Sequence, residues 1–449
     1  MLVVGGDAAG MSSASQARRA AGPDELEIVA FERGPRTSYA ACGLPYFVEG
    51  LIESPGRLIA RTPEQFESND ILVHVRHEVT AIDTAAGTLT VRDLDSGAER
   101  TEAWDELVVG TGAVGIRPPL EGIDASGVMQ LRVVEDAVEI DRRIRGGLRR
   151  AVVVGAGYIG LEVAEALARR GVEVTVLEMA DAPMAGTLDP DMAALVTEAV
   201  HVAGVDLRLG EAVQGFEVSH GRLTGVAGPS GVLPTELAVL GLGARPNTEL
   251  AAAAGLPIGP AHGIVVDSRM HTPTDGVWAA GDCVESRHRL TGEPVVVALG
   301  THANKQGRVL GTNVAGGDAR FPGVIGTAIT RFCETEIGRT GLTEAQAAAA
   351  GIEVLATTSK SRTRAHYYPG GTPVTTKLLT RRADGVLLGA QVVGGPGAGK
   401  RIDVLATAIW VGMTAEDLSM SDLSYAPPFS PVWDPVALAA GVAARDLRH

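Results

Sequence analysis

The chain is poor in lysine and cysteine, and each shortage argues against a class of function. Only four of the 449 residues are lysine, and a formal net charge of −15 leaves no basic stripe for a nucleic acid or an anionic membrane surface. Three cysteines, odd in number and widely spaced, fit neither a disulfide framework nor a zinc site. The histidines show no metal-ligand spacing, so we expect no metal site.

Long apolar runs are missing as well. No segment approaches the ~18 consecutive apolar residues that a membrane span requires. The first residues run straight into a glycine-rich turn at Gly5, without the basic and apolar regions of a secretory signal. A hydrophobic fraction of 45% is nevertheless ordinary for a packed protein. We therefore expect a soluble, cytoplasmic protein of several domains.

The abundant glycines form a repeat of strand, glycine turn and helix that begins at Gly5 and again at Gly155. In the second copy, Gly155, Gly157 and Gly160 make a complete G-x-G-x-x-G, in which backbone N–H groups approach a pyrophosphate at a helix N-terminus. Glu178, about 20 residues further on, is placed to accept a hydrogen bond from a ribose 2′-OH and to repel a 2′-phosphate. This copy predicts an NADH site, with NADPH less favoured.

The first copy departs from the pattern, because Asp7 stands where the middle glycine is expected between Gly5 and Gly10. Its surroundings restore the signal, since a second strand over residues 26–32 ends in Glu32, a candidate ribose acceptor. Two such units imply two dinucleotides, and a hydride route needs both a nicotinamide and a flavin. We therefore assign FAD to the first copy.

Two further segments support a flavin. Residues 106–112 and 277–282 are short strands that end in glycine, and they resemble the second and third flavin-contact motifs of the flavoproteins with two dinucleotide-binding domains. Asp282 would hold the ribityl or phosphate region. The expected FAD contacts are Gly5, Gly10, Glu32, Arg33, Thr111, Gly112, Gly281 and Asp282.

Cys42 lies in a turn-prone segment, residues 38–46, that follows the second strand. This segment, residues 365–370 and residues 424–429 resemble the active-site stretches of the single-cysteine pyridine nucleotide-disulfide oxidoreductases, and the likeness runs over the whole chain. Within that group the chain is most similar to the coenzyme A-disulfide reductases. Expected substrates are a small-molecule disulfide, persulfide or oxygen, and the expected assembly is a homodimer.

The chemistry agrees with a single cysteine. A two-cysteine relative would carry C-x-x-x-x-C, but Pro45, Tyr46 and Phe47 occupy the region of the partner. Cys42 must therefore form a mixed disulfide with an external sulfur or be oxidised to a sulfenic acid. The attacking species is a thiolate, which the helix that follows Gly10 would help to stabilise if its positive end points toward Cys42.

The resemblance also implies residue roles. In the coenzyme A-disulfide reductases, two tyrosines that match Tyr367 and Tyr425 lie near the sulfurs from opposite subunits. The histidine that contacts a sulfenic acid in NADH peroxidases matches Ala8 here, which disfavours a peroxidase. The positions that match the coenzyme A contacts are Ser12, Gln16, Arg19, Ser38 and Asn304.

Three positions depart from that pattern and keep alternatives open. Lysines that contact coenzyme A in the reductases match Asn69 and Trp433, and an asparagine beside the cysteine matches Ala41. With fewer cations, a smaller disulfide, a persulfide or polysulfide, or oxygen remains a candidate substrate, as does a coenzyme A cap on resting Cys42. The alternatives are an NADH oxidase, an electron-transfer flavoprotein that serves a quinone or ferredoxin, and a flavoprotein sensor.

These observations predict an α/β protein with two Rossmann-like dinucleotide-binding domains, arranged as in glutathione reductase, and a C-terminal α+β dimerisation domain. The expected FAD-binding domain spans residues 1–112 and 237–318, the NAD(P)-binding domain 113–236, and the dimerisation domain 319–449. The predicted activity is the reduction of coenzyme A disulfide, or of a related persulfide or polysulfide, by NAD(P)H through FAD and Cys42.

Overall fold

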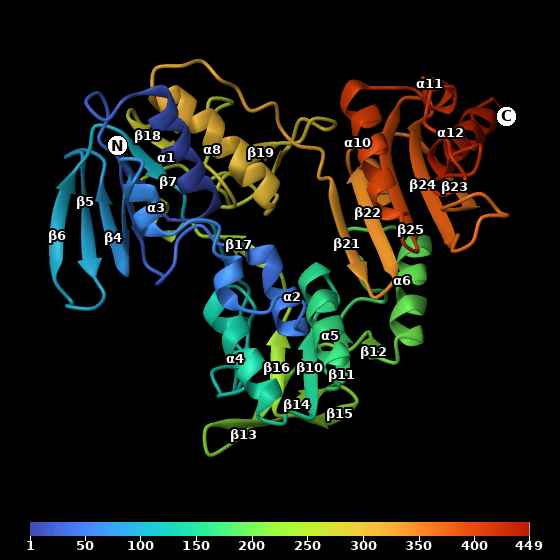
Figure 1. Cartoon of the computed structure of the whole chain (residues 1–449), viewed down its shortest axis with the longest axis horizontal. Coiled ribbons are helices and arrows are strands. Elements are labelled where there is room, and N and C mark those ends of the chain that lie inside the picture. Colours follow the sequence, from blue (N-terminus) through green and yellow to red (C-terminus); the bar gives the residue numbers. More distant parts are fainter. Residues whose placement is uncertain (449) are drawn as a thin grey trace. The chain divides into compact units, whose positions relative to one another are not determined.

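The computed structural model describes residues 1–448, and the chain divides into two compact units (Figure 1). Each unit contains a five-stranded parallel sheet, and the second unit also contains a five-stranded antiparallel sheet. The first unit comprises Met1–Leu44, Ile52–Ile116 and Gly243–Val324. The second comprises Pro45–Leu51, Arg117–Leu242 and the chain from Ile325 onward.

The parallel sheet of the first unit has the order β18-β7-β1-β2-β3. Strands β1 and β7 are fully buried runs of Val and Leu, as expected for a parallel sheet that is covered on both faces. All the strand pairs of this sheet are parallel, so the carboxyl ends of the strands lie at one edge. The strands are β1 (Leu2–Val4), β2 (Val29–Glu32), β3 (Leu72–Val75), β7 (Leu107–Val109) and β18 (Val277–Ala279).

Helix α1 (Ala8–Ala20) packs closely against helix α8 (Gly300–Val314) (Figure 1). Glycine allows the approach, because a Cβ at Gly307 would lie 2.5 Å from the carbonyl oxygen of Ala9. A Cβ at Gly311 would lie 2.2 Å from the carbonyl oxygen of Ser13. The two helices are almost 300 residues apart in sequence, and their contact creates one wall of the groove described below.

The remaining elements of the first unit are short. An antiparallel sheet is formed by β4 (His77–Asp83), β5 (Thr88–Asp93) and β6 (Glu99–Ala103). The others are η1 (Ala41–Gly43), η2 (Pro55–Leu58), α3 (Pro63–Glu67), β8 (Ala113–Gly115), β17 (Ala244–Pro246), α7 (Glu249–Ala253), β19 (Ser286–Arg287) and β20 (Pro294–Val295).

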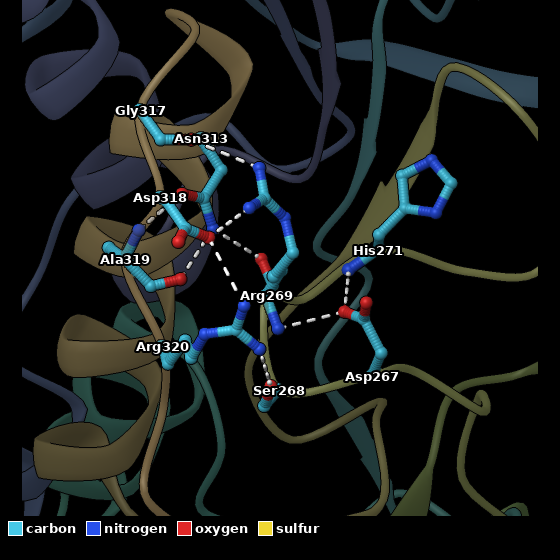
Figure 2. A network of polar contacts seen from close by, with 9 residues as sticks. All are labelled: Asp267, Ser268, Arg269, His271, Asn313, Gly317, Asp318, Ala319 and Arg320. Carbon is cyan, nitrogen blue, oxygen red and sulfur yellow. Dashed lines mark hydrogen bonds and ion pairs between the residues drawn. The ribbon is translucent and has the colours of Figure 1, made fainter.

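A polar network fastens the end of α8 to the turn at residues 267–271 (Figure 2). The Asn313 amide donates to the carbonyl oxygens of Arg269 and Ala319 at 2.9 and 2.8 Å and accepts from the N–H of Ala319 at 2.7 Å. The guanidinium of Arg269 pairs with Asp318 and donates to the carbonyl oxygen of Gly317. These bonds hold residues 313–319 against the turn at residues 267–271.

The parallel sheet of the second unit has the order β12-β11-β10-β16-β9. Strand β16 pairs with β10 in parallel, with Leu237 opposite Ala151. It therefore belongs to this sheet, whereas the predicted boundary at residue 237 assigned it to the FAD-binding domain. The chain returns to the first unit at Gly243. The strands are β9 (Val128–Met129), β10 (Arg150–Val154), β11 (Glu173–Glu178), β12 (Asp206–Leu209) and β16 (Leu237–Leu240).

Helices flank this sheet, and a small antiparallel sheet is inserted before β16. The helices are α2 (Leu44–Glu49), α4 (Val134–Arg145), α5 (Tyr158–Arg169) and α6 (Pro190–Val202). The inserted strands are β13 (Gly215–Ser219), β14 (Arg222–Gly228) and β15 (Gly231–Pro234).

The C-terminal part of the second unit is an antiparallel sheet with the order β21-β22-β25-β24-β23. Its central strands β24 and β25 are almost entirely buried. The strands are β21 (Ala328–Phe332), β22 (Thr335–Gly341), β23 (Val354–Arg362), β24 (Pro373–Arg381) and β25 (Leu387–Gly394), and the helices are α9 (Glu344–Ala349), η3 (Gly399–Arg401), α10 (Ile402–Val411), α11 (Ala415–Ser419) and α12 (Pro435–Asp446).

One buried lysine joins this sheet to the start of α6. The side chain of Lys377 on β24 is 4% exposed, and its Nζ lies 2.6 Å from Asp191 Oδ1 and 3.3 Å from Asp189 Oδ2. It also pairs with Glu344. Asp189 is held further by Gln391, whose Nε2 donates to Asp189 Oδ2 at 2.7 Å. One ammonium group therefore compensates a cluster of three carboxylates.

Replacing this lysine is expected to destabilise the second unit. Lys377→Met removes the ammonium that pairs with all three carboxylates and should lower the free energy of unfolding by about 3 kcal/mol, because Asp189 stays buried without its ion pair. Lys400→Met is the control, since Lys400 is 76% exposed and its pairing with Asp403 is worth below about 1 kcal/mol. Denaturant unfolding followed by circular dichroism measures both. Equal, small losses would contradict the cluster's role.

Candidate functional site

The first glycine turn connects β1 to α1 and leaves no room for side chains at its ends. Gly5 has φ +105°, and a Cβ there would lie 2.2 Å from the carbonyl oxygen of Gly110. A Cβ at Gly10 would lie 2.0 Å from the carbonyl oxygen of Gly5. Glu32 at the end of β2 accepts hydrogen bonds from the N–H groups of Gly6 at 2.8 Å and Gly34 at 2.6 Å. The predicted ribose acceptor thus also holds the turn, with lone pairs left for a ligand.

The second glycine turn repeats this construction between β10 and α5. Gly155 has φ +100°, and a Cβ at Gly160 would lie 1.9 Å from the carbonyl oxygen of Gly155. Glu178 at the end of β11 accepts from the N–H groups of Ala156 at 2.7 Å and Ala180 at 2.9 Å. A Cβ at Gly157 would meet no atom within 4 Å, so the middle of this turn faces open space. Such a turn fits the pyrophosphate of a dinucleotide.

The other predicted FAD contacts lie at the carboxyl ends of neighbouring strands of the first sheet. Thr111 and Gly112 follow β7, and the Thr111 hydroxyl donates to the carbonyl oxygen of Asn247 at 2.6 Å. Gly281 and Asp282 follow β18, and the N–H of Gly281 donates to Gln306 Oε1 at 2.8 Å. These residues share one edge of the sheet with the first glycine turn and Glu32, next to which the exposed Arg33 lies. The carboxyl edge of such a parallel sheet is where dinucleotides bind, so these residues could hold FAD.

The segment that carries Cys42 is anchored on the first glycine turn. The N–H of Ser38 donates to the carbonyl oxygen of Gly6 at 2.9 Å, and the Thr37 hydroxyl binds the same oxygen. The N–H of Tyr39 donates to Asp7 Oδ1 at 3.3 Å. Cys42 follows in η1 and is exposed.

Downstream of Cys42 the chain enters helix α2, which is held within the second unit. The guanidinium of Arg169 on α5 lies 3.2 Å from the carboxylate of Glu49, whose side chain is buried. The guanidinium of Arg170 donates to the carbonyl oxygen of Val48 at 2.8 Å. Cys42 therefore lies two residues before the point at which the chain passes from one unit to the other.

A groove of about 270 Å³ lies in the first unit between the paired helices α1 and α8 and residues 60–66, and Ser38 of the Cys42 segment lines it as well. Four of the five predicted coenzyme A contacts line it, namely Ser12, Arg19, Ser38 and Asn304. The hydroxyl of Ser12 donates to Asn304 Oδ1 at 2.6 Å. The fifth, Gln16, lies beside the groove and accepts from the Arg19 guanidinium at 3.0 Å.

Two further guanidinium groups line the groove, and sequence reasoning missed both. Arg61 lies over the ring of Phe66 at 4.8 Å, and Arg308 projects from α8. Among residues 1–448, no carboxylate forms an ion pair with Arg19, Arg61 or Arg308. Three uncompensated cations in a chain of net charge −15 favour an anionic ligand. Arg308 lies four residues after Asn304, one helical turn along the same face, which is a signal that could have identified it.

The two predicted catalytic tyrosines lie together in the second unit. The hydroxyls of Tyr367 and Tyr425 are 3.2 Å apart, and their residues are 64% and 45% exposed. Phe429, Val432 and Trp433 are also exposed on the loop that precedes α12. This hydrogen bond to Tyr367 raises the pKa of Tyr425 above its usual value.

Residues 1–448 hold no group of three or more histidine, cysteine, aspartate or glutamate side chains arranged to bind a metal ion. None of the helices in this range combines the length and the apolar character needed to cross a membrane.

Comparison with known proteins identifies close relatives over the whole chain. A family model described as pyridine nucleotide-disulphide oxidoreductase matches residues 1–307, and a model of its dimerisation domain matches residues 327–436. The chain is 39% identical over 444 residues to NAD(P)H coenzyme A polysulfide/persulfide reductase of Pyrococcus horikoshii, with 98% of each chain covered. It is 30% identical over 453 residues to coenzyme A disulfide reductase of Staphylococcus haemolyticus, which covers 100% of this chain and 99% of the relative.

Solved structures agree. The water-forming NADH oxidase from Lactobacillus brevis, bound to NADH, matches with a TM-score of 0.94 at 28% identity over 100% of this chain and 98% of that chain. These matches confirm the predicted resemblance, the enzyme class and the fold class of two Rossmann-like domains with a dimerisation domain. Members of the matched family use FAD and a nicotinamide nucleotide.

The pairing of the tyrosine hydroxyls can be tested by titration. The pKa of Tyr425 is raised because its hydroxyl is hydrogen-bonded to Tyr367, so Tyr367→Phe should return it to about 10. Tyr368→Phe is the matched control, since Tyr368 lies beside Arg364 and makes no such bond. Phenolate absorbance against pH, with the curve of Tyr425→Phe subtracted, isolates Tyr425. An unchanged Tyr425 titration in Tyr367→Phe would show that the hydroxyls are not paired in solution.

Proposed function

Because the chain belongs to the pyridine nucleotide-disulphide oxidoreductase family, we propose that it reduces coenzyme A disulfide, or a coenzyme A persulfide or polysulfide, with NADH through FAD and Cys42. The observation that carries this proposal is the groove beside the Cys42 segment, with three guanidinium groups that lack carboxylate partners. Coenzyme A brings a pyrophosphate and a 3′-phosphate, and guanidinium groups bind phosphate through paired hydrogen bonds.

Arg61 and Arg308 also bear on Asn69 and Trp433, the two positions at which the coenzyme A-disulfide reductases carry lysine. Asn69 donates to the carbonyl oxygen of Gln65 within its own turn, and Trp433 is exposed in the other unit. Arg61 and Arg308 place positive charge in the groove from other parts of the chain. The cations expected from the resemblance are thus replaced rather than lost, which favours a phosphate-bearing substrate over a small neutral disulfide.

FAD and NADH, held at the two glycine turns, would supply the electron pair. The thiolate of Cys42 attacks one sulfur of the substrate disulfide, a Cys42–S–S–R bond forms as the substrate S–S bond breaks, and the first RS⁻ leaves and takes up one proton from solvent. Two electrons and one proton then cleave this bond, RSH is released and the Cys42 thiolate is regenerated. Tyr367 and Tyr425 of the partner subunit would donate hydrogen bonds to the leaving sulfur, which lowers the cost of expelling a thiolate.

The other cysteines support the role of an external sulfur. Cys283 is fully buried, and its thiol lies within hydrogen-bond distance of the carbonyl oxygens of Val109 and Ala280. Burial raises the pKa of Cys283, which disfavours its thiolate. Burial also raises the pKa of Cys333 in the β21–β22 turn. Cys42 is the exposed cysteine, and the position of a two-cysteine partner is taken by Phe47.

Glu178 favours NADH over NADPH. Its carboxylate is fixed by the two backbone N–H groups described above, at the point where the ribose 2′ position of the nucleotide would lie. A 2′-phosphate at this place would meet a held negative charge.

Cys42→Ser should abolish disulfide reduction, because no thiolate remains to attack the substrate, while FAD stays bound and reducible by NADH. Cys333→Ser is the control and should retain turnover. The assays are NADH consumption with coenzyme A disulfide and the flavin absorbance after NADH addition. Retained turnover in Cys42→Ser would contradict the mechanism and point to electron transfer to a quinone or ferredoxin. Oxygen uptake that matches NADH consumption without a disulfide would indicate an oxidase.

Arg61→Ala and Arg308→Ala should each raise KM for coenzyme A disulfide by about tenfold, the loss expected for one charge-assisted phosphate contact. The KM for cystine, which lacks phosphate, should stay unchanged. Arg57→Ala is the matched control, because Arg57 lies near Arg61 in sequence, outside the groove, and its side chain is 69% exposed. Equal effects on both substrates would show that the arginines do not bind phosphate.

A further inference from the structure

Asp7 is the one residue of the first glycine turn that the proposed function leaves unexplained. It replaces the middle glycine, at which the backbone of such a turn approaches a pyrophosphate. In the second turn the matching residue is Gly157, and the space beside it is open. In the first turn a carboxylate lies there, directly before α1, and accepts a hydrogen bond from the N–H of Tyr39 at 3.3 Å.

The groups around Asp7 make the negative charge of its carboxylate unfavourable. Glu32 of β2 and Asp282 after β18 act on it as like charges, while the N–H groups of Ala8 and Tyr39 oppose them. Burial is the largest influence, and together these effects raise the pKa of Asp7 to about 6. FAD would bring a further negative pyrophosphate to this turn, and like charges raise the pKa of a carboxyl group.

We propose that Asp7 takes up one proton from solvent when FAD binds, so that this protein holds FAD more weakly as pH rises through neutrality. The proton joins the carboxylate and removes its repulsion of the pyrophosphate, and no bond to FAD is formed or broken. The inference rests on FAD as the cofactor and is independent of the sulfur substrate and of Cys42.

The direction in which the Kd for FAD changes with pH follows from proton linkage. Below about pH 6 Asp7 is protonated with or without FAD, so FAD affinity is constant there. Between the pKa of the free protein and the higher pKa of the FAD complex, binding takes up a proton and the Kd rises with pH. If the pyrophosphate raises the pKa by about one unit, the Kd for FAD increases about tenfold between pH 5 and pH 8.

The test measures FAD release from the full-length holoprotein after dilution at pH 5 to 8, by the fluorescence of free flavin. The wild-type Kd should rise about tenfold. Asp7→Asn keeps an oxygen for the N–H of Tyr39 without a charge, so its Kd should be nearly independent of pH and lower than that of the wild type at pH 8. Asp24→Asn, which removes an exposed carboxylate of the same unit, should retain the wild-type slope.

A second measurement needs no variant. Calorimetric titration of the flavin-free full-length protein with FAD at pH 7, in two buffers of different ionisation enthalpy, counts the protons taken up. Uptake of a substantial fraction of one proton is expected. A wild-type Kd that stays constant from pH 5 to 8, zero proton uptake, or an Asp7→Asn variant with the wild-type slope would each overturn the proposal. A failure of disulfide reduction in the Cys42 experiment would leave it standing.

Discussion

In both parallel sheets, the carboxylate at the end of the second strand binds a backbone N–H of the glycine turn. Glu32 binds Gly6 and Glu178 binds Ala156, at 2.8 and 2.7 Å. This bond ties the second strand to the turn that starts the first helix, and the absence of Cβ atoms at Gly10 and Gly160 lets the turns close. In the first sheet the same turn also holds residues 37–39, which donate hydrogen bonds to the carbonyl oxygen of Gly6 and the carboxylate of Asp7. The cofactor turn thereby positions the start of the cysteine segment.

The groove depends on a different contact. Helices α1 and α8 approach closely only because Gly307 and Gly311 lack side chains, and this approach brings Asn304 and Arg308 beside Ser12 and Arg19. The groove proposed to bind coenzyme A thus lies along helix α1, whose first turn follows the glycine turn proposed to hold FAD. The positive charge in the groove is unusual for an acidic chain, and it is the basis of the proposed preference for a phosphate-bearing substrate.

Cys42 lies in the first unit, two residues before the chain enters the second. Its upstream neighbours bind the first glycine turn, and its downstream helix α2 is tied to α5 of the second unit through Arg169 and Arg170. The exposed thiol thus follows directly on a segment that is anchored on the first glycine turn, and an exposed thiol can be reached by an external disulfide.

The sequence by itself predicted the two glycine turns with the acids that follow them, Cys42 as the candidate redox cysteine, and the enzyme family, because these signals are local: glycine spacing, strand periodicity and short motifs. It did not locate the edge of the second sheet, since β16 was assigned to the other domain, and it missed Arg61 and Arg308. Strand partners and converging side chains depend on contacts between segments that are far apart in the chain. The pairing of β16 with β10 decided the edge of the second sheet, and the packing of α8 on α1 decided which side chains meet in the groove.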